Sequence, residues 1–161
     1  MIFVTVGGQL PFDRLIRHVD DWAAKHPDVE VFAQIGRSEF APRHLDSAKL
    51  LPGVEFMERM QTADAIIGHA GMGTILTALE IRKPLLIFPR RAEQGEHRND
   101  HQLATARYFA ESGLVRAAFD EASLLQELDE LGGWEPSAGI ATVASDELIG
   151  RIRSFVFDGP A

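Results

Sequence analysis

The clearest indication of the fold comes from residues 65–81, which read AIIGHAGMGTILTALEI. Residues 65–67 are apolar, as in a buried strand, and they run directly into a glycine-containing turn over 68–74. From Thr74 onward the apolar positions recur at helical spacing until Pro84, which blocks continuation of the helix. A buried strand, a glycine turn and a helix in this order are typical of domains in which parallel strands alternate with helices.

The same alternation continues on both sides of this segment. Further strands are predicted at 2–6, 29–35, 54–57, 85–88 and 115–118, and further helices at about 12–26, 98–112, 120–131 and 145–156. A long polar loop is expected over 37–53, and residues 58–64 are expected to form a helical turn. Gly113 is expected to end one helix, while Asp120 and Ser145 cap the next two. We therefore predict an α/β fold in a single domain, with a mostly parallel sheet and helices on both faces.

The overall composition restricts the possible functions. The chain has 161 residues, 45% of them hydrophobic and 25% charged, which fits one globular domain. A net charge of −8 gives little electrostatic reason to bind nucleic acid. The chain contains no cysteine, so disulfides, zinc–thiolate sites and thiol nucleophiles are excluded. Neither a secretory leader nor an apolar run long enough to span a bilayer is evident, and we expect a soluble protein.

The turn at 68–74 has the properties of an anion site. Ligands of open α/β sheets bind beyond the carboxyl ends of the strands, and this turn follows such an end. Glycines at 71 and 73 let the backbone approach a ligand, the following helix offers free N–H groups, and Thr74 adds a hydroxyl. The turn matches neither the P-loop nor the dinucleotide-binding glycine pattern. A turn whose glycines serve packing alone is therefore the alternative.

A second candidate segment, residues 89–102, follows the next strand and reads PRRAEQGEHRNDHQ. It combines hydrogen-bond donors with carboxylates at the expected ligand edge, as in sites that bind hydroxyl and phosphate groups. The alternative is a solvated charged loop. His97 and His101 are four residues apart and could ligate a metal from one helix face. No His-Glu-x-x-His pattern accompanies them, so no metal is predicted.

The two segments, taken together over residues 66–106, resemble the nucleotide-sugar-binding half of inverting GT-B glycosyltransferases. More narrowly, they resemble the C-terminal domain of the peptidoglycan lipid-intermediate N-acetylglucosaminyltransferase and the soluble subunit of split UDP-N-acetylglucosamine transferases. Shorter segments that resemble the split subunit are 4–7, 12–15 and 34–36. Residues 89–102 look most like its bacterial exopolysaccharide versions. The similarity covers about residues 1–115 and implies a single Rossmann-like domain over residues 1–161.

The resemblance implies a UDP-sugar site built from both segments. The backbone and hydroxyl around Gly71, Gly73 and Thr74 would hold the pyrophosphate. His101 and Gln102 would touch the donor sugar and the ribose. The full predicted set is Gly7, His69, Gly71, Met72, Gly73, Thr74, Arg90, Glu96, His97, Asn99, His101 and Gln102.

One departure from the family pattern concerns the ribose. Relatives commonly have an acidic residue three positions after the one that matches Thr74, whereas this chain has Thr77. A threonine cannot chelate two hydroxyls as a carboxylate does. Another group must then contact the ribose, and the candidates are Glu80, Glu93 and Glu96.

By this resemblance the chain would be the UDP-sugar-binding subunit of an inverting glycosyltransferase that transfers a hexose or N-acetylhexosamine to a lipid-linked acceptor in polysaccharide synthesis. A membrane-anchored partner would bind the acceptor and supply the general base, for which this chain offers no candidate. The resemblance implies a cytoplasmic location, at the membrane only through that partner, and no metal or cofactor besides the UDP-sugar substrate. Two alternatives are a non-catalytic nucleotide-sugar-binding regulator and a homodimer that catalyses transfer alone.

Apolar residues outside the expected core predict an interface. They are Phe40, Pro42, Leu45, Leu50 and Leu51 in the long loop, and Phe155, Val156 and Phe157 at the end of the last helix. An uncovered cluster of this size usually marks a contact surface. The alternative, packing of the last helix against its own sheet, is expected for Ile152 and Phe155. We predict that the isolated chain dimerises.

Overall fold

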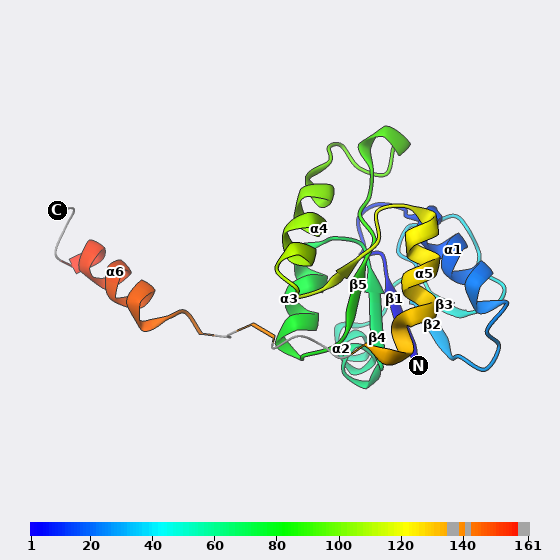
Figure 1. Cartoon of the computed structure of the whole chain (residues 1–161), viewed down its shortest axis with the longest axis horizontal. Coiled ribbons are helices and arrows are strands. Elements are labelled where there is room, and N and C mark those ends of the chain that lie inside the picture. The colour runs from blue at the N-terminus through cyan, green and yellow to red at the C-terminus, as the bar shows by residue number, and fades with distance from the viewer. Residues whose placement is uncertain (135–138, 141–142, 158–161) are drawn as a thin grey trace.

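The structure of the chain is a computed structural model that describes residues 1–134, 139–140 and 143–157. Within these residues, six parallel strands form one sheet in the spatial order β3-β2-β1-β4-β5-β6 (Figure 1). The strands are β1 (Ile2–Thr5), β2 (Val31–Gln34), β3 (Asp46–Ala48), β4 (Ala65–Gly68), β5 (Leu85–Ile87) and β6 (Arg116–Ala117). The helices are α1 (Asp13–Ala23), α2 (Gly53–Thr62), α3 (Met72–Glu80), α4 (His101–Glu111), α5 (Glu121–Glu130) and α6 (Asp146–Phe157), with 3-10 turns at Ala92–Gln94 and Leu131–Gly133. The predicted α/β fold with a parallel sheet is confirmed.

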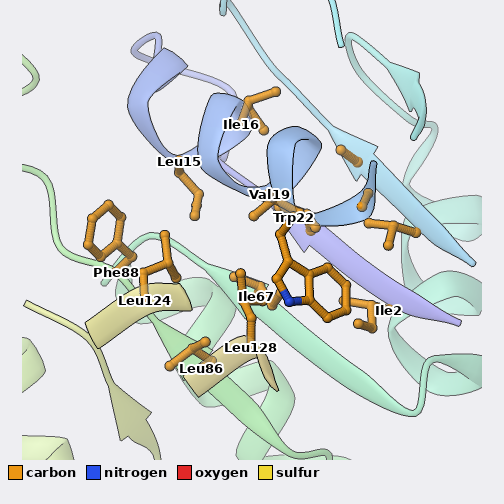
Figure 2. Packing of buried hydrophobic residues seen from close by; sticks show 14 of the residues in the cluster. Ile2, Leu15, Ile16, Val19, Trp22, Ile67, Leu86, Phe88, Leu124 and Leu128 are labelled. Carbon is orange, nitrogen blue, oxygen red and sulfur yellow. The ribbon is translucent and has the colours of Figure 1, made fainter. Parts of the chain in front are cut away.

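Helices cover both faces of the sheet, as predicted. On one face α1 and α5 pack over the strands, and the buried side chains of this layer include Leu15, Val19, Ile67, Leu124 and Leu128 (Figure 2). On the other face the buried side chains of α2, α3 and α4 include Met60, Ile75, Ala78, Ala106 and Phe109. Successive residues of β1 point to opposite faces, since Phe3 belongs to the second core and Val4 to the first. Burial on both faces explains why the inner strands are continuously apolar.

The order in which the chain adds strands to the sheet reverses direction between β1 and β4. The chain moves outward through β2 and β3 on one side, and then continues from β4 to β6 on the other side. This is the strand order of Rossmann domains, in which ligands bind outside the carboxyl ends of the strands at the reversal. Thr5 of β1 lies opposite Gly68 of β4 in the sheet register, so the turns that follow these two residues start side by side.

The prediction of a strand at 54–57 is wrong, because these residues belong to α2. Phe56 and Met60 lie four residues apart and both pack against the second core, whereas Val54 is 75% exposed. The apolar positions therefore follow a helical period, which a four-residue window does not reveal. Residues 58–62, expected as a short turn, are the second half of this helix.

The third strand lies inside the segment that was expected to be a loop. β3 pairs in parallel with β2 at one edge of the sheet, with Ser47 opposite Ala33. Its residues are polar or small and are mostly exposed, so they lack the apolar pattern of the inner strands. Backbone pairing, and not side-chain burial, defines this edge strand.

Three predicted helix boundaries are confirmed. Asp120 accepts a hydrogen bond from the backbone N–H of Ser123 at 2.8 Å, in a capping box at the start of α5. Ser145 Oγ accepts from the N–H of Leu148 at 3.3 Å at the start of α6. Gly113 follows α4 with a φ of +68°, the left-handed conformation that ends many helices.

α6 extends away from the sheet and its covering helices (Figure 1). The packing expected for Ile152 and Phe155 is wrong, since these side chains are 54% and 68% exposed. In the long loop, by contrast, Phe40, Leu45 and Leu51 pack against the two cores. The apolar surface outside the core therefore lies mainly on α6. In the part of the chain that the structure describes, no helix has the length and apolar character needed to cross a membrane.

Candidate functional site

A cleft of about 540 Å³ lies at the carboxyl edge of the sheet, among the turns that follow β1, β4 and β5. Its lining residues are Val6, Gly7, Gly8, Gln9, Leu10, Phe56, His69, Gly73, Thr74, Thr77, Arg90, His97, His101 and Gln102. The two segments that the sequence indicated, 68–74 and 89–102, both contribute to this one cleft. We call it the carboxyl-edge cleft.

The first turn of α3 supplies backbone donors to this cleft. A helical hydrogen bond runs from the N–H of Ile75 to the carbonyl of Gly71 at 3.1 Å. The N–H groups of residues 72–74 precede this bond and have no acceptor within the helix. A Cβ placed on Gly73 would have no protein atom within 4 Å, so this residue leaves open space at the cleft wall. Free amides and the positive end of the helix dipole favour an anion here.

The ring of His69 lies between two glycines in the cleft wall. A Cβ on Gly71 would lie 2.2 Å from His69 Nε2, and a Cβ on Gly7 would lie 3.0 Å from His69 Cε1. Gly7 also has a φ of +72°, a conformation that favours glycine. Gly71 thus makes room for the imidazole, a role that its spacing in the sequence did not indicate.

The protonation state of His69 follows from its surroundings. Burial, and secondarily the positive charge of Arg90, lowers the pKa of His69 to about 4. His69 is therefore neutral at pH 7. Its Nδ1 atom is buried and has no hydrogen-bond partner among the described residues. With this pKa the imidazole can form hydrogen bonds to a ligand but is a weak general base at neutral pH.

Arg90 joins the turn after β1 to the start of α4. Its Nη2 donates to the carbonyls of Val6 and Leu10, both at 2.7 Å. Its backbone N–H donates to Gln102 Oε1 at 3.1 Å, which leaves the Nε2 group of Gln102 as the end available to a ligand. Burial lowers the pKa of Arg90 to about 10, so the guanidinium stays charged at pH 7. Arg90 therefore holds the cleft together and also places a positive charge beside it.

Two further histidines lie at the entrance to α4. The rings of His97 and His101 pack edge to face with their centroids 4.5 Å apart. Burial, followed by the charge of His101, lowers the pKa of His97. Asn99 Oδ1 contacts Nδ1 of His101, while Asn99 itself is exposed. α4 begins at His101 and not at position 98 as predicted, because residues 98–100 form the turn that precedes it.

Most of the predicted set lies in the cleft. The members that line it are Gly7, His69, Gly73, Thr74, Arg90, His97, His101 and Gln102. Gly71 and Asn99 contact lining histidines, and Met72 is 46% exposed on α3. Glu96 lies behind the cleft, where its carboxylate accepts from Arg14 at 2.7 and 2.8 Å. Contact of these residues with a UDP-sugar stays a prediction.

The carboxylates considered for the ribose are not part of the described cleft lining. Glu80 is the last residue of α3, and Glu93 pairs with Arg91 at 3.1 Å. Thr77 does line the cleft, one helical turn after Thr74. The position at which the resemblance implies a ribose contact therefore faces the cleft, but it carries a threonine.

The sequence did not indicate five of the lining residues as site residues, namely Val6, Gly8, Gln9, Leu10 and Phe56. The first four lie just after β1, so the rule that ligands bind past the carboxyl ends of strands was a usable signal for them. Phe56 lies in the segment that was expected to be a strand, and no local pattern predicted that it would line the cleft. In residues 1–134, 139–140 and 143–157, no three His, Cys, Asp or Glu side chains are grouped so as to hold a metal ion.

The profile of the glycosyltransferase family 28 C-terminal domain matches residues 1–136. The chain belongs to this family. One curated relative is the UDP-N-acetylglucosamine transferase subunit ALG13 of Yarrowia lipolytica, which is 29% identical over 99 residues. The match covers 52% of this chain and 48% of the relative, so the chain spans about half the length of that protein.

Solved structures confirm the Rossmann-like fold of this family 28 domain. The NMR solution structure of ALG13 has a TM-score of 0.60 at 20% identity, and the match covers 94% of this chain and 93% of that one. The crystal structure of MurG from Acinetobacter baumannii has a TM-score of 0.57 at 24% identity, covering 81% of this chain and 41% of MurG. The crystal structure of Os79 from O. sativa in complex with UDP has a TM-score of 0.61 at 12% identity, covering 82% of this chain and 31% of Os79.

Proposed function

We propose that this chain binds a UDP-sugar and forms the donor half of an inverting glycosyltransferase. The observation that carries the proposal is the carboxyl-edge cleft, which lies at the reversal of the strand order and includes the first turn of α3. A diphosphate in this cleft meets free amides, the positive end of a helix dipole and the nearby charge of Arg90. The reaction transfers a hexose or N-acetylhexosamine to a lipid-linked acceptor in polysaccharide synthesis.

The donor half has to stabilise the departing diphosphate. Negative charge develops on the β-phosphate as the sugar leaves, and donors that are fixed before the reaction stabilise this charge without reorganisation. The amides of α3 are fixed by the helix that follows them. Thr74 is only 8% exposed and lines the cleft, so the residue that carries the hydroxyl also contributes one of these amides. We assign contact with the diphosphate to this group of donors.

The general base is assigned to a membrane-anchored partner subunit that also binds the acceptor. His69, with a pKa of about 4, is too weak a base for this task at neutral pH. The relative ALG13 is described as a subunit of its transferase, which supports a two-chain enzyme. The exposed apolar side chains of α6 support a contact with another protein. This chain then acts in the cytoplasm and reaches the inner face of the membrane through its partner.

The substitution Gly73→Ala tests nucleotide binding most directly. A Cβ at Gly73 meets no protein atom within 4 Å, so the variant folds, and alanine adds about 0.5–1 kcal/mol of helix stability. The same methyl group occupies space at the cleft wall, where it displaces the diphosphate. We expect the Kd of UDP to rise by about tenfold or more, as measured by calorimetry.

Gly53→Ala is the matched control for this experiment. Gly53 also lies in the first turn of a helix, has the same open space around a Cβ, and is not part of the described cleft lining. We expect its UDP affinity to equal that of the wild type. An unchanged UDP affinity in Gly73→Ala would show that the diphosphate does not lie against this wall. No binding of any uridine nucleotide to the wild type at millimolar concentration would refute the proposed function.

Two other functions use the same cleft and are separated by a transfer assay. A regulator binds the UDP-sugar but transfers no sugar with or without a partner, and a self-sufficient homodimer transfers it alone. The assay compares the purified chain with the chain co-expressed with a membrane-anchored acceptor-binding subunit. Transfer that requires both chains supports the proposal. Transfer by this chain alone, in a form that light scattering identifies as monomeric, would refute it.

A further inference from the structure

A largely buried ion pair behind the cleft holds the segment that carries His97. Glu96, which immediately precedes His97, accepts from Arg14 Nε at 2.7 Å and from Arg14 Nη2 at 2.8 Å. Both side chains are 11% exposed, so this bidentate pair is shielded from water. Glu96 Oε2 also accepts from the backbone N–H of Arg91 at 2.9 Å. The Glu96 carboxylate therefore binds Arg14 of α1 and also the backbone of Arg91, so it fixes both ends of residues 91–96 relative to α1.

Arg14 is itself held by groups outside the cleft. Its guanidinium lies 4.1 Å from the centroid of the Phe88 ring, a favourable cation–π distance. Its Nη2 donates to the carbonyl of Pro89 at 3.0 Å, and its Nη1 pairs with Glu121 of α5 at 3.3 Å. Arg14 is not among the residues that line the described cleft. It therefore influences the cleft through the residues that it holds.

The segment between β5 and α4 projects beyond the carboxyl end of the sheet before the chain turns into α4 (Figure 1). Much of its hydrogen bonding is internal, since Gly95 N–H donates to the carbonyl of Ala92 at 2.9 Å and Ala92 N–H donates to Asp100 Oδ1 at 2.8 Å. Arg90 anchors the start of the segment through the carbonyls of Val6 and Leu10. Beyond Arg90, the second tie to the body besides the ion pair is the bond from Arg91 Nη2 to the carbonyl of Phe119. Segments with few ties to the core open at low free-energy cost. The position of residues 91–97 therefore depends strongly on the ion pair.

We propose that Arg14 and Glu96 are positioning residues of the donor site, and that their pair holds His97 in the carboxyl-edge cleft where it contacts the nucleotide-sugar. His97 lines the cleft and its ring packs against His101, whereas Glu96 is turned toward α1. The identity of the ligand rests on the proposed function. The placement of His97 does not, so it can be tested in the ligand-free protein.

The first test is the titration of the His97 imidazole, followed by NMR in the wild type and in Glu96→Gln without ligand. Burial, and to a smaller extent the charges of His101 and Arg90, holds the pKa of His97 below its ordinary value. Release of the segment removes these effects and raises the pKa. Loss of the Glu96 charge without release of the segment would lower the pKa of His97, because a nearby negative charge favours the imidazolium. A rise supports the proposal, and an unchanged or lower pKa overturns it.

Glu127→Gln is the matched control for a general loss of stability. Glu127 of α5 pairs with Arg116 of β6 at 2.5 Å, and its side chain is 23% exposed. This pair also joins a carboxylate to an arginine, but neither residue lines the described cleft. We expect the titration of His97 to be unchanged in Glu127→Gln. Arg14→Lys keeps the charge but not the bidentate geometry, so it is expected to give a smaller rise in the pKa of His97 than Glu96→Gln.

The second test measures the affinity for UDP and UDP-N-acetylglucosamine by calorimetry. If the released segment occupies the correct position about one tenth of the time, the apparent Kd rises about tenfold. We expect this rise in Glu96→Gln and no change in Glu127→Gln. A raised pKa of His97 with unchanged affinity would overturn the role of the pair in the donor site. A wild type that binds no uridine nucleotide would refute the proposed function, while the titration of His97 would still decide whether the pair positions this residue.

Discussion

Two cavities of similar size lie at opposite edges of the same sheet and differ in their chemistry. The carboxyl-edge cleft measures about 540 Å³ and contains glycines, histidines and Arg90, whereas a cavity of about 480 Å³ lies at the amino edge. The residues that line this amino-edge cavity are Met1, Ile2, Trp22, His26, Val29, Asp64, Leu128, Asp129, Leu131 and Gly132. It is therefore apolar with acidic groups. Cavity volume alone does not identify the functional site of this domain.

The direction of the strands explains the difference. Each parallel strand is followed by a turn and a helix, so α3 directs the positive end of its dipole toward the carboxyl edge, while α1 and α5 end near the amino edge. The carboxylates at the amino edge already have partners within the protein. Asp129 accepts from Trp22 Nε1 at 2.7 Å, and Asp64 pairs with the N-terminal ammonium of Met1 at 2.5 Å. We therefore expect changes at the amino edge to alter stability alone, and changes at the carboxyl edge to alter nucleotide binding whether or not they also alter stability.

The largest expected effect is at the amino edge, in Trp22→Ala. Trp22 is 6% exposed, and truncation of a buried tryptophan lowers the free energy of unfolding by about 3–5 kcal/mol. Trp22→Phe keeps an aromatic ring and loses the bond to Asp129, at a cost of about 1 kcal/mol. Urea denaturation measures both losses. Weaker UDP binding by folded Trp22→Phe would remove the functional distinction between the two edges.

The next effect is a pH dependence of stability that arises from His69. The pKa of His69 is 6.5 when unperturbed and about 4 in the folded protein, so the unfolded chain binds the proton first as the pH falls. The stability due to the neutral imidazole is complete above about pH 6.5 and is lost progressively down to about pH 4, by about 3 kcal/mol. We expect His69→Gln to lack this component when unfolding is measured across this range. Equal pH dependence in both proteins would contradict the burial of His69.

Gly71→Ala is expected to have an intermediate effect at the carboxyl edge. Its Cβ would lie 2.2 Å from His69 Nε2, so the ring must move, at a cost of about 1–3 kcal/mol in stability. The displaced ring also weakens UDP binding. Gly132→Ala is the control at the amino edge, since a Cβ there meets no atom within 4 Å. Thermal denaturation and calorimetry should detect losses in the first variant alone, and an effect of Gly132→Ala on UDP binding would contradict the comparison.

The smallest expected effect is that of Thr74→Val. Valine has the shape of threonine but no hydroxyl, so the loss of one hydrogen bond to phosphate raises the Kd of UDP by about tenfold, or about 1.4 kcal/mol. Thr62→Val is the control, because the Thr62 hydroxyl is exposed on α2 and donates to the carbonyl of Glu58 at 2.8 Å. Calorimetry with UDP compares the two variants. Equal affinities would mean that the Thr74 hydroxyl does not contact the ligand.

Local patterns in the amino-acid sequence were sufficient for most of the fold and for the two site segments. Apolar runs, the glycine turn at 68–74 and caps such as Asp120 and Gly113 depend on residues that are neighbours along the chain. The rule that parallel strands present their carboxyl ends at one edge then placed 68–74 and 89–102 together. The structure confirms this placement in one cleft.

Features that depend on residues far apart in the chain were established only by tertiary packing. Residues 54–57 are helical although they form a short apolar run, and Phe56 of this helix packs against Phe3 with ring centroids 5.4 Å apart. The pairing of Glu96 with Arg14, which lies 82 positions earlier in the chain, was not indicated by the sequence. The polar strand β3 exists because its backbone completes the edge beside β2. Such pairings form only when the chain has folded, so no local pattern in a single sequence contains them.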